Sequence, residues 1–254
     1  MRFDKIMKIN FGNINPTFSS TGRFYKAKDG DEFGCNSWLF REDMDWKRLA
    51  NYEIEHFKDK ESVNTLMFAA SDGSEAYTNI ISIYENSKDK TDTIKFFPIM
   101  AYDLDDEIVK VANSGYLKTC LSDRMQLQTE IENYEDYFEK TDKKLEIAGD
   151  KGLQSEKTLK VKEILTKNVN FHQGNMFEKI KELKDNSNTI LLCRNILGYF
   201  LDDKIEEFIQ TASKFLKSGS LFAIGDHDSR FFDIKSCMEH FGFKEVFKNL
   251  YEKI

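Results

Sequence analysis

Polar residues follow several short apolar runs of the sequence, at the point where each run ends. The run TLMFAA (65–70) is followed by SDGSE, and the run ending in IMAY is followed by Asp103 in DLDD. In an open parallel sheet, ligands bind outside the carboxyl ends of the strands, near the point where the strand order reverses. A carboxylate there can accept two hydrogen bonds from the vicinal hydroxyls of a ribose, so Asp103 is a candidate for that contact.

The SDGSE loop offers a second contact. Gly73 lets the backbone approach a ligand closely, and the helix that follows presents free N–H groups. The sequence lacks the GxGxxG pattern of dinucleotide-binding loops, so an ordinary strand-to-helix turn is the alternative. Two alternatives also stand near Asp103: Asp105 or Asp106 caps the next helix, or the three aspartates bind a hard cation. We expect no metal, because no His or further carboxylate cluster accompanies them.

Asn residues follow two further apolar runs of the sequence. Asn has both donor and acceptor groups, so it can read an adenine edge or orient an amino-acid group. A buried Asn that only ties loops together is the alternative. The four histidines are scattered, and only His227 lies at a predicted strand end; we assign none of them a chemical role. The candidate residues are Asn175 and Met176 after NVNFHQG, and Arg194, Asn195, Ile196 and Tyr199 after TILLC.

The elements that must position these residues alternate between strand and helix. Apolar residues recur at helical spacing from Trp46 to Phe57, with Asp43 as the expected N-cap. Strand-like runs at TLMFAA, from Ile94 to Tyr102, at NVNFHQ and at TILLC are each followed by an amphipathic helix. This alternation predicts an α/β fold with a doubly wound, mostly parallel sheet. The run SLFAIGD adds a strand, and FKEVFKNLYEKI predicts a closing antiparallel pair.

Two segments depart from the alternation. Residues 118–168 are strongly charged and predict a small inserted antiparallel subdomain, with a helical stretch at MQLQTEIENYEDYF and a hairpin in KLEIAGDKGLQSEKTLKVKE. Residues 1–34 show no sustained period, so we expect an irregular arm or short strands there. The remainder, 35–254, is predicted to be one domain.

Composition limits the classes of function. The chain has 254 residues, is 40% apolar and carries a net charge of −7, which disfavours a sequence-independent grip on nucleic acid. No apolar run is long enough for a membrane span, and the start does not resemble a secretion signal, so we expect a cytoplasmic protein without membrane insertion. The four cysteines form no CxxC pair, which argues against a zinc site and a disulfide framework.

The set of strand-end loops resembles, in order and spacing, the CheR-type chemotaxis protein methyltransferases. The matching stretches are FRE (40–42), AASDGSEAY (69–77), AYDLDDEIVKVANSGYL (101–117), YF (137–138), FHQGNMFE (171–178), CRNILGYF (193–200) and LFAIGDHDS (221–229). The resemblance implies a class I, Rossmann-like fold of the S-adenosylmethionine (SAM) methyltransferases, with SAM as cofactor and S-adenosylhomocysteine as product. It also implies methyl transfer to glutamate side-chain carboxylates of a protein substrate, with the cytoplasmic part of a chemoreceptor as the expected partner.

The resemblance carries over residue by residue. The family's T-x-F-F-R motif matches Ser37 and Arg41, and its tyrosine beside the transferable methyl matches Tyr199, which makes Arg41 and Tyr199 the expected catalytic residues. We expect Arg41 to hold either the SAM carboxylate or the incoming glutamate, because guanidinium binds a carboxylate bidentately. The implied cofactor contacts are Ser37, Arg41, Ala70, Glu75, Asp103, Asn175, Met176, Asn195 and Ile196.

Several departures leave the substrate open. We expect the arm 1–34 in place of the family's N-terminal helical domain, the first loop reads SDGSEAY instead of STGEEPY, and GHSE has become GDHDS. A methyltransferase acting on another protein or a small molecule, and a non-catalytic SAM-binding regulatory module, therefore remain alternatives. In some family members an edge strand of the inserted subdomain pairs with a receptor peptide; residues 140–162 could do so, but their many lysines favour a solvated edge.

Overall fold

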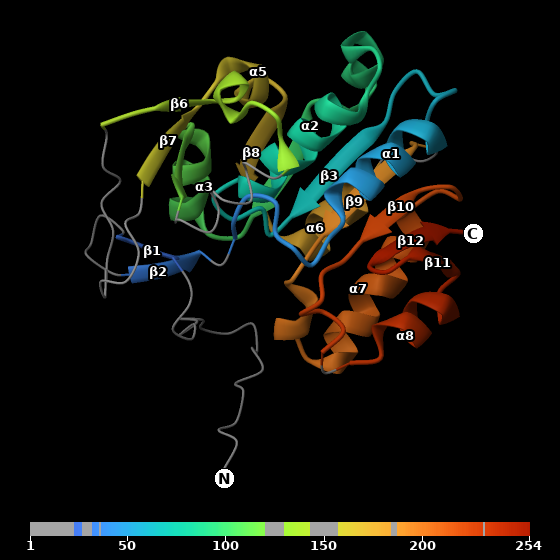
Figure 1. Ribbon diagram of the computed structural model, residues 1–254. Coiled ribbons are helices and arrows are strands. Elements are labelled where there is room, and N and C mark those ends of the chain that lie inside the picture. Colours follow the sequence, from blue (N-terminus) through green and yellow to red (C-terminus); the bar gives the residue numbers. More distant parts are fainter. Residues whose placement is uncertain are drawn as a thin grey trace.

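A seven-stranded sheet forms the centre of the molecule (Figure 1). The computed structural model describes residues 23–26, 32–35, 37–119, 130–142, 157–183, 187–230 and 232–254. The strand order is β11-β12-β10-β9-β3-β4-β8, in which the five strands from β10 to β8 run parallel, β12 runs antiparallel to β10, and β11 runs antiparallel to β12. The strands are β3 (Asn64–Phe68), β4 (Ile99–Asp103), β8 (Val169–Gln173), β9 (Thr189–Cys193), β10 (Leu221–Ala223), β11 (Phe243–Phe247) and β12 (Leu250–Lys253).

The order of the strands fixes where a ligand can bind. The chain moves outward from β3 to β4 and β8, then returns to place β9 on the other side of β3. The connections therefore diverge between β3 and β9, which are paired from Asn64 with Thr189 to Phe68 with Cys193. In a sheet of this kind the crevice at the carboxyl ends of such a pair is the ligand-binding position.

Helices cover both faces of the sheet, and alternate residues of each strand point to opposite faces. On β9, for example, Ile190 and Leu192 pack in one core cluster, whereas Leu191 and Cys193 pack in the other. One cluster includes residues of α1 (Trp46–His56), α2 (Ser74–Asn86), α3 (Asp106–Asn113) and α5 (Glu163–Thr166). The opposite cluster includes residues of α6 (Met176–Lys179), α7 (Asp202–Phe215) and α8 (Ile234–His240).

The predicted α/β class is confirmed, including the mostly parallel sheet and its closing antiparallel pair. One strand boundary was wrong: the strand expected from Ile94 begins only at Ile99, because residues Lys90–Phe96 form the 3₁₀ helix η1. Asp89 caps that helix by accepting a hydrogen bond from the Thr91 N–H, and the buried Phe96 side chain packs in the core. In the sequence, a buried apolar residue of a 3₁₀ helix cannot be distinguished from a buried strand residue, so Phe96 was assigned to the strand.

The N-cap of α1 was also misplaced. The Asp45 carboxylate, not that of Asp43, accepts the hydrogen bond from the Arg48 N–H at 2.9 Å and so caps the helix. The Asp43 side chain is directed instead to the carboxyl end of β9, where it meets Arg194 and Asn195.

A second, three-stranded antiparallel sheet forms the inserted subdomain, with the order β5-β7-β6. The helical prediction for 125–138 was wrong over 131–138, which hold the 3₁₀ turn η2 (Tyr134–Asp136) and the first residue of β6, whereas 125–129 lie outside the described residues. The first half of the predicted hairpin also lies outside the described residues. The second half of that hairpin is β7, which pairs with both neighbours, so this part of 140–162 is not an open edge strand, whereas 143–156 lie outside the described residues. The strands are β5 (Tyr116–Thr119), β6 (Phe138–Lys140) and β7 (Lys157–Val161), with the 3₁₀ turn η2 (Tyr134–Asp136) before β6.

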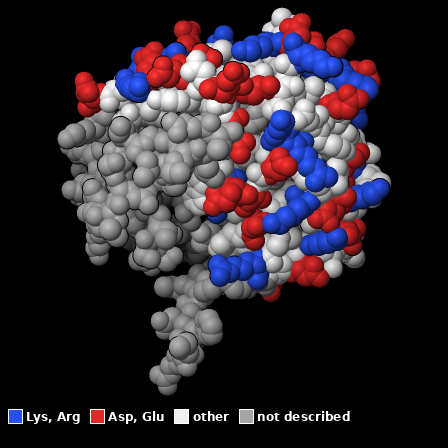
Figure 2. All heavy atoms as spheres, viewed as in Figure 1, with Lys and Arg blue, Asp and Glu red and all other residues white. Residues whose placement is uncertain are grey.

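Near the start of the chain, β1 (Arg23–Lys26) and β2 (Glu32–Cys35) form a two-stranded antiparallel sheet. Short strands were one of the two alternatives expected for the arm, and β2 crosses the expected domain boundary at 34/35. On the surface shown in Figure 2, acidic and basic side chains are interspersed on the coloured part of the face. Among the residues that the structure places, no helix combines the length and apolar content needed to cross a membrane.

Candidate functional site

The loop between β3 and α2 is built from left-handed residues. Ala69, Ser71 and Gly73 have φ values of 54°, 53° and 88°, so the backbone turns tightly before α2 begins at Ser74. The Ala70 N–H donates to the Tyr102 carbonyl on β4, at 3.0 Å. The loop therefore lies at the predicted crevice, with the N-terminal end of α2 beside it.

Asp103, the predicted ribose ligand, joins this loop to the end of β4. One carboxylate oxygen accepts a hydrogen bond from the Ser71 N–H at 2.9 Å, and the other accepts one from the Asp105 N–H at 3.1 Å. Burial raises the pKa of Asp103, and these backbone hydrogen bonds oppose the rise. Each oxygen has a second lone pair, so the carboxylate can still accept hydrogen bonds from a diol.

The two neighbouring aspartates have other tasks. Asp105 caps α3 by accepting from the Glu107 N–H at 2.9 Å, as one of the alternatives for this loop predicted. Asp106 pairs with Lys110 on the exposed side of the same helix. These contacts favour helix capping over a shared cation for the acidic loop.

Arg194, which directly follows β9, is a buried cation between two carboxylates. Its side chain has no exposed surface. Nη1 lies 2.8 Å from Oε1 of Glu75, Nη2 donates to Oδ1 of Asp43, and the guanidinium stacks 4.6 Å above the Trp46 ring. Burial raises the pKa of Glu75, and the charge of Arg194 acts in the opposite direction. The predicted cofactor residue Glu75 is thus held by Arg194 at the start of α2.

The side chain of Asn195 is largely occupied by the protein. Its Nδ2 donates to Oδ2 of Asp43 at 2.9 Å, and its Oδ1 accepts from the His227 N–H at 3.1 Å. A Cβ at Gly225 would lie 2.2 Å from that Oδ1, so only glycine fits there. These contacts favour the loop-tying alternative for the Asn195 side chain, whereas the backbone that continues to Ile196 stays a candidate for the cofactor.

Asp228 was not among the predicted site residues, yet it binds the backbone of the loop after β9 and of the loop after β10. Its buried carboxylate accepts hydrogen bonds from the N–H groups of Asn195 and Gly225, each at 2.7 Å, and of Gly198 at 3.3 Å. Burial raises its pKa to about 6, although the backbone donors oppose this. The motif GDHDS marked the position in the sequence, but the choice between its two aspartates required the fold.

The pair Asn175 and Met176 follows β8. Asn175 caps α6, since its side-chain oxygen accepts from the Phe177 N–H at 2.9 Å. The Met176 side chain is buried among the core residues that face α7. Both residues lie at the carboxyl-end edge of the sheet, as expected. Their contacts described above are all with other residues of the protein, so contact with the cofactor stays a prediction.

The segment 37–41 passes over the start of α2, where the Phe40 N–H donates to the Thr78 hydroxyl at 3.0 Å. Ser37 is buried, and its Oγ has no hydrogen-bond partner among the described residues. The Arg41 guanidinium stacks 4.3 Å above the Trp38 ring, and its Nε lies 3.6 Å from Oδ1 of Asp43.

Tyr199 ends the 3₁₀ turn η4 (Leu197–Tyr199) and stacks on His227, with the ring centroids 4.5 Å apart. The pKa of His227 is lowered by burial, then by the charges of Arg230 and Arg41. Arg41 therefore lies within electrostatic range of the stacked pair and also of Glu75. The two expected catalytic residues come together at the same sheet edge as the expected cofactor residues.

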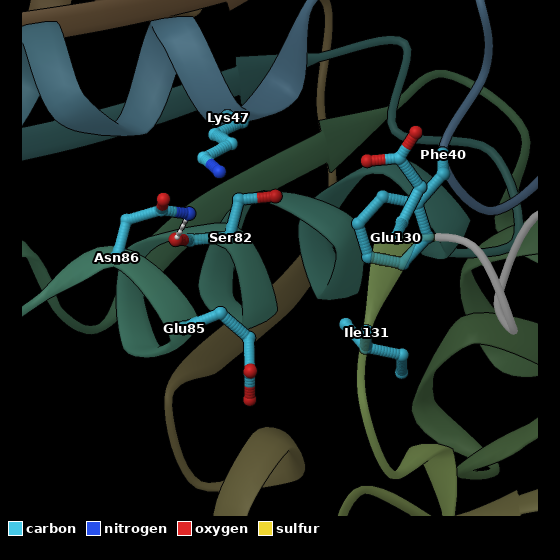
Figure 3. Close-up of a pocket in the computed structure, with 7 residues that line it drawn as sticks. All are labelled: Phe40, Lys47, Ser82, Glu85, Asn86, Glu130 and Ile131. Carbon is cyan, nitrogen blue, oxygen red and sulfur yellow. Dashed lines mark hydrogen bonds between the residues drawn. The ribbon is translucent and has the colours of Figure 1, made fainter.

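A separate hollow lies between α1, α2 and residues 130–131 (Figure 3). Phe40 is its only link to the segment 37–41, and none of the predicted site residues lines it. Its lining residues are Phe40, Lys47, Ser82, Glu85, Asn86, Glu130 and Ile131.

A comparison with family models decides the family. The model for the SAM-binding domain of CheR methyltransferases matches residues 36–246. The chain belongs to this family. The CheR match agrees with the strand order, with the crevice at β3 and β9 and with the loops that line it. No curated protein matches the sequence.

Two of the solved structures that resemble this CheR-family chain are described as SAM-dependent methyltransferases. A SAM-dependent methyltransferase from Clostridium acetobutylicum ATCC 824 is 16% identical with a TM-score of 0.33; the match covers 73% of this chain and 52% of that one. A TehB-like SAM-dependent methyltransferase from Corynebacterium glutamicum is 9% identical, with a TM-score of 0.39 and coverages of 82% and 91%. This chain thus spans about half of the first protein, and at these TM-scores neither likeness informs the substrate.

The sequence missed the residues that hold the site together. Asp43 was assigned to a helix cap, and Asp228 was assigned no role. A conflict between Asp43 and Asp45 as caps was visible in the sequence, since either stands close before Trp46. For Asp228 the only signal was its place after a predicted strand.

Proposed function

We propose that this protein transfers the methyl group of SAM to glutamate side-chain carboxylates of a protein, with chemoreceptors as the expected substrates. The observation that carries the proposal is the position of Arg41. Its Nε lies 3.6 Å from Oδ1 of Asp43, whose carboxylate binds Arg194 and Asn195 at the carboxyl end of β9. A guanidinium at that position can bind a carboxylate bidentately.

The described residues fit the cofactor. Glu75 is a carboxylate with only 12% of its side chain exposed, suited to the ammonium of an amino-acid group, and Asp103 has further lone pairs for a ribose. The Ser37 hydroxyl is buried without a partner among the described residues, as expected of a donor that waits for a ligand. These three side chains, at three neighbouring loops, would hold the amino-acid and ribose parts of SAM.

The chemistry asks little of the protein beyond orientation. When bound, SAM supplies a methyl group that is activated by a positive sulfonium. A glutamate carboxylate is already ionised at neutral pH, because its unperturbed pKa is about 4.3, so the site needs no general base. Holding two reactants in line contributes on the order of 7–11 kcal/mol to the barrier reduction. Arg41 would orient the acceptor carboxylate, and the Tyr199 ring, fixed by its stack on His227, would line the position of transfer.

The test is a labelling experiment with SAM that carries a radioactive methyl group. The purified protein is incubated with the cytoplasmic fragment of a chemoreceptor, and the label on the fragment is then exposed to base. We expect base-labile label, which identifies a carboxyl ester. Base-stable label on the fragment would contradict the glutamate assignment while leaving methyl transfer in place.

A second candidate is methyl transfer to another acceptor, either a different protein or a small molecule. The observation in its favour is His227, which stacks directly on Tyr199. His227 lies in GDHDS, the stretch that differs from the family's GHSE motif. An aromatic pair at this point also suits a flat acceptor. Label that appears only with small-molecule acceptors would select this candidate.

A further inference from the structure

The Asp43 carboxylate joins three loops at the candidate site. Its Oδ1 accepts a hydrogen bond from Nη2 of Arg194, and its Oδ2 accepts from Nδ2 of Asn195 at 2.9 Å and from the Asp226 N–H at 3.2 Å. Its backbone carbonyl accepts from Nδ2 of Asn249 at 3.1 Å. One side chain thus ties the loop before α1 to the ends of β9 and β10.

Asp43 reaches Glu75 through Arg194. The Arg194 guanidinium is planar, so pairing with Asp43 on one side and Glu75 on the other fixes its orientation above Trp46. Because the Arg194 side chain is fully buried, losing one partner would leave a costly, partly compensated charge. Arg194 would then turn toward Glu75 as its remaining carboxylate.

The charges of this cluster also matter. Arg194 and Arg41 contribute +1 each, while Asp43 and Glu75 contribute −1 each when ionised, so the four charges sum to zero. Without the Asp43 charge the sum is +1, and the two arginines compete for Glu75 with any cationic ligand. SAM carries a positive sulfonium that S-adenosylhomocysteine lacks, so the loss of the Asp43 charge disfavours SAM more than its product.

We propose that Asp43 is a positioning residue, which holds Arg194 and Asn195 and so gives Glu75 the orientation and the surrounding negative charge that bind the cationic end of SAM. This inference rests on the proposed role of Glu75 at the cofactor. It adds a residue that neither the family match nor the motif comparison marks, and it adds a preference between cofactor and product.

The experiment is titration calorimetry with SAM and with S-adenosylhomocysteine on the full chain. Three forms are compared: wild type, Asp43→Asn and Asp45→Asn. Asp45 is the matched control, because it lies two residues away and only caps α1. We expect Asp43→Asn to weaken SAM binding about tenfold or more and S-adenosylhomocysteine binding clearly less, which lowers the SAM preference. Asp45→Asn should leave both affinities at the wild-type values.

Other results overturn the inference. Wild-type affinities in Asp43→Asn exclude a positioning role, and equal losses for both ligands reduce Asp43 to a structural residue. A wild-type protein that binds neither ligand refutes the proposed function itself, which separates the two failures. If Asp43→Asn does not fold, Arg194→Lys takes its place, since an ammonium cannot bridge both carboxylates in a planar fork; unchanged SAM affinity in that variant also overturns the inference.

Discussion

At the residue scale, each carboxylate that is proposed to contact SAM also makes hydrogen bonds within the protein. For Asp103 these two roles can be tested separately. Asp103→Asn keeps the shape but removes the charge and one of the two acceptors that bind the N–H groups of Ser71 and Asp105. We expect SAM affinity to fall about tenfold or more, measured by calorimetry. Asp105→Asn is the control, because that residue only caps α3 and should cost about 1 kcal/mol of stability at most, without loss of affinity. Equal SAM affinity in Asp103→Asn and wild type would remove Asp103 from the ribose site.

Arg41 can be tested without disturbing the fold. Its guanidinium stacks on Trp38 and its Nε lies 3.6 Å from Asp43, outside the fully buried core, so Arg41→Ala should lower the midpoint of thermal unfolding by no more than a few degrees. We expect methyl transfer to fall by about two orders of magnitude or more, since orientation of the acceptor is lost. Arg41→Lys keeps the charge but not the bidentate geometry, and it should recover only part of the activity. Full activity in both variants would exclude the role.

The residue types at the strand ends could be predicted from the sequence, but their partners could not. Asp103, Asn195 and Tyr199 lie at the carboxyl-end edge of the sheet, as the pattern of runs indicates. The two partners of the Asn195 side chain, however, stand 152 and 32 residues away, at Asp43 and His227. Only the strand order brings those segments together, so the sequence could not show whether the amide was free.

At the element scale, the β3–α2 loop depends on Gly73, which is required both by its backbone conformation and by the space around it. Gly73 has a φ of 88°, and a Cβ there would lie 2.6 Å from a ring atom of Phe171. Gly73→Ala should therefore destabilise the protein by about 1–3 kcal/mol, measured by urea unfolding, and weaken SAM binding. Gly219→Ala is the control, since Gly219 has a φ of 84° but open space around its Cα. Gly219→Ala therefore measures the cost of backbone strain alone. An equal loss of unfolding free energy in both variants would contradict a packing role for Gly73.

Elements with a clear period were predictable, and those without one were not. The helices α2 and α7 follow from residues such as Ile80, Ile81, Phe208 and Ile209, whose spacing buries one face. The turn η1 was read as a strand because Phe96 is buried from it. The central position of β7 also escaped the sequence, since pairing depends on segments about 20 and 40 residues away.

At the scale of the whole molecule, helix–helix packing contains a buried acid that links global stability to pH. Glu53 lies on the face of α1 that meets α2 and has no exposed surface; its Oε2 accepts from Nδ2 of Asn79 at 3.2 Å. Burial raises its pKa from 4.5 to about 8. Its position, seven residues after Trp46 on the buried face, was visible in the sequence, but the lack of a cation partner among the described residues was not.

The sign of the effect follows from proton binding. Between pH 4.5 and 8 the folded state keeps the Glu53 proton whereas the unfolded state releases it, so stability is greatest below pH 4.5 and is lost as the pH rises to 8. Each unit of pKa difference corresponds to about 1.4 kcal/mol, which gives a loss on the order of several kcal/mol from this group.

The variant Glu53→Gln removes the titrating group but keeps an amide beside Asn79. We expect it to be more stable than wild type at pH 8 and to lose less stability between pH 6 and 8, measured by urea unfolding at each pH. Asp228, with its pKa of about 6, has the same sign but completes most of its titration at lower pH, so the upper window reports mainly on Glu53. Glu55→Gln, on the exposed side of α1, should keep the wild-type slope. A Glu53→Gln variant with the wild-type slope would show that the proton on Glu53 does not couple the α1–α2 interface to the stability of the whole fold.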